Sequence, residues 1–148
     1  MKNVVLVALL ALTVSACQST ETTQIETRPQ TTLQQSAHAQ PGSQAVSPAI
    51  ATAMFSKMCG GERSNVATQA AKLGFVQHST FKTYYHPKLN LSVKLRDGEC
   101  SMVFASDANP QKLHQAFRAN ESQIGKTTFQ PSLIATSTPH YNVRVGNS

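Results

Sequence analysis

Acidic residues are few in this chain of 148 residues, where seven Asp and Glu stand against thirteen Lys and Arg for a formal net charge of +6. From residue 49 onward each acid has a simpler place, in a turn, at a helix end or opposite a base. No pair of carboxylates is therefore left to act as the acid and base of a hydrolase that uses two carboxyl groups. The basic excess lies in the same part of the chain. It favours anionic partners, although such an excess is also an ordinary means of keeping a protein soluble.

The sequence also lacks the short motifs of metal sites and of nucleophilic catalysis. It has five histidines, but neither H-x-x-x-H nor C-x-x-C occurs. No serine lies in a G-x-S-x-G context. We therefore predict no metal, no cofactor and no catalytic residue, and we expect a protein that is not an enzyme.

Aromatic residues make up only 6% of the chain, and none lies between residues 18 and 47. That stretch is rich in Gln, Thr, Ser, Ala and Pro, with Ile25, Leu33 and Val46 as its only large aliphatic residues. A segment of this composition cannot bury a core of its own. We expect residues 17–47 to be a flexible linker, with one globular domain over residues 48–148. The low aromatic content argues against a nucleic-acid partner.

Long apolar runs are missing apart from residues 4–12, which follow Lys2 at the N-terminus. This run is too short to cross a bilayer as a mature helix and is typical of a signal peptide, here over residues 1–16. It is followed by Val-Ser-Ala-Cys at positions 14–17, which resembles the lipobox of bacterial lipoproteins.

The resemblance covers residues 1–17 and implies cleavage before Cys17. The mature cysteine would then carry a diacylglyceryl group and an acyl chain such as palmitate, which together make a stable membrane anchor. Gln18 stands where lipoproteins of this kind have Asp when they stay in the inner membrane, so the resemblance implies the outer membrane, on its periplasmic side or at the surface. An ordinary signal peptide cut near Ala16, with Cys17 incidental, is the alternative.

Cysteine is scarce as well, and three residues are an odd number for an exported chain. A lipid on Cys17 leaves Cys59 and Cys100 as a pair. We predict a disulfide between these two, formed in an oxidising compartment. The chain-entropy model gives roughly 4 kcal/mol for closing a loop of about 40 residues.

The clearest fold signal lies in residues 91–104, where apolar residues alternate on both sides of Asp97-Gly98. An Asp-Gly pair favours a two-residue type I′ turn, and this turn fixes the register of a β-hairpin. One face of the hairpin then pairs only apolar residues, while the other is polar and basic. The apolar pairs are Leu95 with Cys100, Val93 with Met102 and Leu91 with Phe104; the polar face pairs Lys94 with Ser101 and Ser92 with Val103.

Helical spacing predicts helices over residues 48–58, 65–73 and 110–120, with Ser47 and Asn109 as N-caps of the first and third and Gly74 directly after the second. The first of these helices is expected to bury one stripe of side chains. That stripe consists of Ile50, Ala53, Met54 and Met58.

Strands are expected at residues 75–76 and 81–86 in addition to the hairpin. Residues 129–135 and 141–145 would be edge strands, because Pro131 and Pro139 cannot donate to a central ladder. We therefore predict an α+β domain with a small antiparallel sheet of three to five strands, about three helices on one face, and one disulfide.

In the strand at residues 81–86 we expect Phe81, Thr83 and Tyr85 to face inward. The other side chains would then share the outer face with the basic side of the hairpin. The resulting candidate binding face consists of Lys82, Tyr84, His86, Lys94 and Arg96. A slip of one residue would exchange the two faces of the strand.

A basic strip of this kind suits an anionic envelope polymer or an envelope protein. The sequence thus predicts a lipid-anchored, non-enzymatic binding or assembly module of the cell envelope. An ordinary solvated face is the simpler interpretation of the strip and stays open. Two further alternatives stay open: a small envelope hydrolase with an unrecognised active site, and a structural subunit of a secretion or surface-exclusion apparatus.

Overall fold

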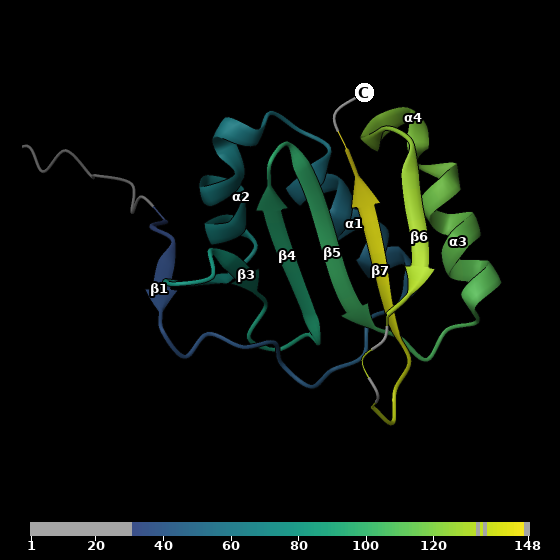
Figure 1. Ribbon diagram of the computed structural model, residues 1–148, viewed down its shortest axis with the longest axis horizontal. Coiled ribbons are helices and arrows are strands. Elements are labelled where there is room, and N and C mark those ends of the chain that lie inside the picture. The colour runs from purple at the N-terminus through teal and green to yellow at the C-terminus, as the bar shows by residue number, and fades with distance from the viewer. Residues whose placement is uncertain (1–30, 133, 135, 147–148) are drawn as a thin grey trace, which may run out of the picture. The chain divides into compact units, whose positions relative to one another are not determined.

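The computed structural model describes residues 31–132, 134 and 136–146 (Figure 1). The expected signal peptide, Cys17 and the first part of the expected linker lie outside these residues. Within them, no helix has the length and apolar character needed to span a membrane.

In the described residues the chain forms four α-helices and one sheet, which confirms the predicted α+β class. The helices are α1 (Pro48–Cys59), α2 (Val66–Lys72), α3 (Pro110–Ala119) and α4 (Glu121–Ile124), with a 3-10 turn at Arg63–Asn65. The strands are β1 (Gln34–Ser36), β2 (Val76–His78), β3 (Thr83–Tyr85), β4 (Leu91–Arg96), β5 (Glu99–Ala105), β6 (Thr127–Pro131) and β7 (His140–Val145).

The sheet of the described residues has seven strands in the order β1-β2-β3-β4-β5-β7-β6, so it is larger than the three to five strands expected. It is also mixed, because β1 and β2 run parallel while the other neighbours are antiparallel. β6 is an edge strand, as Pro131 predicted. β7 lies between β5 and β6, so the expectation of an edge strand at residues 141–145 was wrong. Pro139 precedes β7 and therefore removes no donor from its ladder.

The β4–β5 hairpin forms with the predicted register. All six pairs from Leu91 with Phe104 to Arg96 with Glu99 are present. Asp97 and Gly98 have positive φ angles of 48° and 82°, as a type I′ turn requires. Local turn chemistry therefore sets the centre of the sheet.

Helix α1 starts where predicted, because the Ser47 hydroxyl accepts a hydrogen bond from Ile50 N at 3.3 Å and Pro48 occupies the first turn. The buried stripe differs from the prediction. Ala51, Phe55 and Met58 face the core, while Ile50 is 40% exposed. The helix is rotated because Phe55 packs against Phe117 of α3, with ring centroids 5.6 Å apart in an edge-to-face arrangement.

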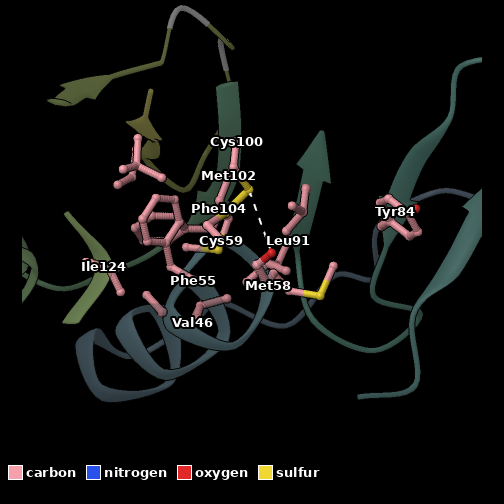
Figure 2. Close-up of a cluster of buried hydrophobic side chains, with 14 of the residues drawn as sticks. Val46, Phe55, Met58, Cys59, Tyr84, Leu91, Cys100, Met102, Phe104 and Ile124 are labelled. Atoms are coloured by element: carbon pink, nitrogen blue, oxygen red, sulfur yellow. Dashed lines mark hydrogen bonds between the residues drawn. A yellow bond between two sulfur atoms is a disulfide. The ribbon is translucent and has the colours of Figure 1, made fainter. Parts of the chain in front are cut away.

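The core lies between α1, α3 and one face of the sheet (Figure 2). The sheet contributes Leu91, Val93, Met102, Phe104 and Val143, all fully buried. Within this core the predicted disulfide joins Cys59, at the end of α1, to Cys100 on β5, with the two Cα atoms 5.6 Å apart. The disulfide therefore ties the first helix of the core to the central hairpin.

The folded unit begins earlier than residue 48, because it takes in residues 31–47 of the expected linker. Gly42 N donates to the carbonyls of His86 and Leu89 at 2.9 and 3.0 Å, and Asn90 N donates to Gln44 O at 2.8 Å. Val46 is 2% exposed and joins the core. The composition of residues 31–47 does not allow this segment to form a core of its own. Its backbone groups can still form hydrogen bonds with the rest of the domain, and the Val46 side chain can pack into the core formed by the rest of the domain.

Candidate binding face on the open side of the sheet

The face of the sheet opposite α1 is the one that Figure 1 presents to the viewer. We call it the open face. Strand alternation places on it the side chains that do not enter the core. Its members are Thr83, Tyr85, Ser92, Lys94, Arg96, Glu99, Ser101, Val103, Asn142 and Arg144, with Thr128 and Gln130 of β6.

The register of β3 is shifted by one residue from the prediction. Tyr84 pairs with Val93, and Tyr85 pairs with Ser92. Tyr84 therefore points into the core, where it is 8% exposed, and burial raises the pKa of its hydroxyl. Tyr85 takes its place on the open face. The expectation that Phe81, Thr83 and Tyr85 face inward was wrong, because Thr83 and Tyr85 lie on the open face and Phe81 is exposed in the turn before β3.

His86 also leaves the predicted binding face. It follows β3 and is half-buried, with its ring perpendicular to that of Phe75 at a centroid distance of 5.4 Å. Its Nδ1 accepts hydrogen bonds from Lys88 N and Leu89 N at 3.2 and 3.0 Å. Burial, with a smaller contribution from the charge of Lys88, lowers the pKa of the imidazole. His86 is therefore a turn residue.

The three basic residues of the predicted face have different places. Lys94 lies on the open face, and among the described acids it has no ion-pair partner. Arg96 is at the end of β4, where its Nε lies 2.9 Å from Asp97 Oδ2. Lys82 lies in the turn before β3 and has a left-handed φ of 52°.

The open face has three basic side chains, as many Lys and Arg as predicted, but two of them lie beside an acid. Arg144, which the sequence did not place there, lies 3.8 Å from Glu99 through its Nη1. Arg96 is already engaged by Asp97. Exposed ion pairs of this kind contribute at most about 1 kcal/mol each to stability. An anionic ligand can therefore compete with Asp97 and Glu99 for the two arginines. Hydroxyl groups from Ser92 and Ser101 and the Tyr85 ring make up the rest of the surface around Lys94.

Two further surface features, a cleft and a pair of aromatic rings, were not predicted from the sequence. A shallow cleft of about 860 Å³ lies beside β1, between Gln34, Ser36, His38, Val76 and Lys88. Sequence patterns could not predict this cleft, because one of its walls belongs to the expected linker. The rings of His78 and Phe81 also lie together, with centroids 4.3 Å apart, in front of β3.

In the described residues no group of three His, Cys, Asp or Glu side chains is arranged to hold a metal ion. The chain was also compared with known proteins. It matches no protein-family model, no curated protein and no solved structure.

Proposed function

We propose that this chain is a lipid-anchored protein of the bacterial outer membrane that binds an anionic envelope polymer or an envelope protein through the open face. It acts as a binding or assembly module without catalysis. The residues Val-Ser-Ala-Cys at positions 14–17, behind a short apolar run, carry the anchor part of this proposal. The lipid at Cys17 keeps the protein at the membrane surface.

The chain between anchor and fold is shorter than the sequence suggested, since β1 begins at Gln34. From Cys17 to Gln34 a fully extended chain reaches about 60 Å at most. The linker expected to reach residue 47 would have allowed about 100 Å. The domain therefore works within a narrow zone next to its membrane.

The composition of the open face supports binding of a hydrated, negatively charged partner. Lys94 offers a cation without an ion-pair partner among the described residues, and Arg144 offers one held only by an exposed pair. The hydroxyls of Ser92 and Ser101 can donate to and accept from a polar chain, and the ring of Tyr85 gives a flat apolar contact. Charge and hydrogen bonding over one exposed surface favour recognition of a polymer or of an acidic protein face.

Affinity capture from an envelope extract tests the binding part. We expect the protein to retain a partner in low salt and to lose it several-fold when Lys94→Gln and Arg144→Gln are combined. The matched control combines Lys112→Gln with Arg118→Gln on α3, where two exposed cations lie outside the open face. Equal capture by both double variants would contradict binding through the open face.

The nature of the captured material separates the kinds of partner. A polysaccharide or other anionic polymer supports polymer binding, and a defined set of envelope proteins supports assembly. Progressive shortening of a captured polymer would contradict the non-enzymatic proposal and favour a hydrolase.

A further inference from the structure

The turn between β2 and β3, residues 79–82, combines two locally unfavourable features. Phe81 is 62% exposed, more than any other large apolar side chain of the described residues. Its neighbour Lys82 has a φ of 52°, a left-handed conformation that a residue with a Cβ rarely adopts. Unfavourable backbone geometry beside an exposed aromatic ring is a combination that often marks a functional turn.

The turn presents Phe81 in a fixed position. Lys82 N donates to His78 O at 3.0 Å. His78 Nδ1 accepts from Thr80 N at 3.2 Å and from Phe81 N at 3.3 Å. The Phe81 ring lies against the His78 ring and still leaves the residue 62% exposed. A group held in this way loses little conformational freedom on binding.

The turn lies next to the strand through which the chain enters the fold. β1 pairs with β2 in parallel, and Ser79 N donates to Ser36 O at 3.3 Å. Seventeen residue steps separate Gln34 from Cys17, so a membrane that holds the lipid lies within about 60 Å of β1. A lipid on Cys17 would therefore keep an apolar surface within reach of the exposed Phe81 ring.

We propose that the β2–β3 turn inserts Phe81 into the interface of the leaflet that holds the lipid of Cys17, with Lys82 at the anionic headgroups. This proposal rests on the proposed lipid anchor. One aromatic ring and one cation bind a bilayer only weakly by themselves, but an anchored domain meets the surface at a high effective concentration. Docking at this turn would set the orientation of the domain on the membrane. It would also bring one edge of the open face next to the headgroups, because the His78 ring that contacts Phe81 also lies against Tyr85, with centroids 6.4 Å apart.

The chain contains no tryptophan, so a single introduced indole reports its own surroundings. The lipidated protein with Phe81→Trp is reconstituted into vesicles of phosphatidylethanolamine and phosphatidylglycerol, with and without brominated acyl chains. The matched control is Ile134→Trp. Ile134 is 49% exposed and lies between β6 and β7, at the end of the sheet away from the β2–β3 turn.

We expect a blue-shifted emission for the indole at position 81 and several-fold stronger quenching by brominated lipid than at position 134. Replacing Lys82 with Ser should reduce this quenching in vesicles that contain phosphatidylglycerol. Equal quenching at the two positions, in protein that floats with the vesicles, would overturn membrane docking and leave the anchor intact. Protein that does not float would refute the anchor and the docking together. An emission shift caused by a soluble polysaccharide and not by vesicles would assign the turn to glycan binding instead and overturn the proposal.

Discussion

Two histidines use the same hydrogen bonds at the ends of two strands. His78 Nδ1 accepts from the amides of Thr80 and Phe81, and His86 Nδ1 accepts from those of Lys88 and Leu89. A neutral imidazole that accepts on Nδ1 carries its proton on Nε2. Neither ring then has a free nitrogen lone pair for a metal, so these histidines shape turns.

His86 makes stability depend on pH in one direction. Its pKa is lowered in the folded protein, so the unfolded chain binds the proton more tightly. The neutral ring therefore contributes stability that is fully present above the unfolded pKa of about 6.5 and is lost as the pH falls.

We predict that the free energy of unfolding of the wild type decreases between pH 7.5 and pH 5.5 relative to that of His86→Asn. An asparagine can accept the same turn hydrogen bonds and does not titrate. Replacement by alanine should cost about 1 kcal/mol at the higher pH, because the turn loses its acceptor. Urea unfolding at the two pH values measures both effects. A constant difference between wild type and His86→Asn would show that His86 is not the titrating group.

Tyr84 and Tyr85 show why the candidate face was placed on the wrong side chains. β3 has only three residues, and either register puts one tyrosine inward and one outward. The choice depends on the partner strand, where Val93 faces the core and pairs with Tyr84. No signal within residues 81–86 contains that information. Arg144 was missed for a similar reason, since its face depends on β7 lying beside β5.

At the scale of elements, predictions from local chemistry succeeded. The Asp97-Gly98 turn predicted a whole hairpin, and Ser47, Asn109 and Gly74 mark helix ends as expected. Gly74 has a φ of 77° and completes a Schellman motif, with Phe75 N donating to Ala70 O at 2.9 Å.

Elements that depend on distant partners were harder to predict. The buried face of α1 is decided by Phe117 of α3, and β1 exists only because β2 offers it a free edge. The composition of residues 31–47 gives no hint that β1 pairs with β2. Sequence patterns describe what a segment can bury, whereas pairing with an edge needs only backbone groups.

Gly42 provides a test of how firmly residues 31–47 belong to the fold. A Cβ at this position would lie 2.2 Å from the carbonyl carbon of Lys88, so the segment would have to move away from the loop that binds it. We predict that Gly42→Ala lowers the free energy of unfolding by about 2 kcal/mol. Gly61→Ala is the control, because a Cβ there meets nothing within 4 Å. If the two variants have equal stability in urea unfolding, residues 31–47 contribute little to the fold.

For the whole molecule, the disulfide and the proposed lipid anchor are both consistent with export of the chain to an oxidising compartment. The Cys59–Cys100 bond joins α1 to β5 inside the core, and a bond of this kind persists in an oxidising compartment. The proposed signal peptide would bring the chain to such a compartment, and the proposed lipid on Cys17 would account for the third cysteine. The open face and the β2–β3 turn then have a defined membrane close by.

The chemical state of Cys17 in protein isolated from bacterial envelopes is the most direct test of the central claim. We predict that mass spectrometry of the mature N-terminal peptide finds Cys17 at the first position with a diacylglyceryl group and an amide-linked acyl chain. We also predict that Cys17→Ser moves the protein from the membrane fraction to the soluble fraction. An unmodified Cys17, or a Cys17→Ser variant that stays in the membrane, would contradict the claim of a lipid anchor.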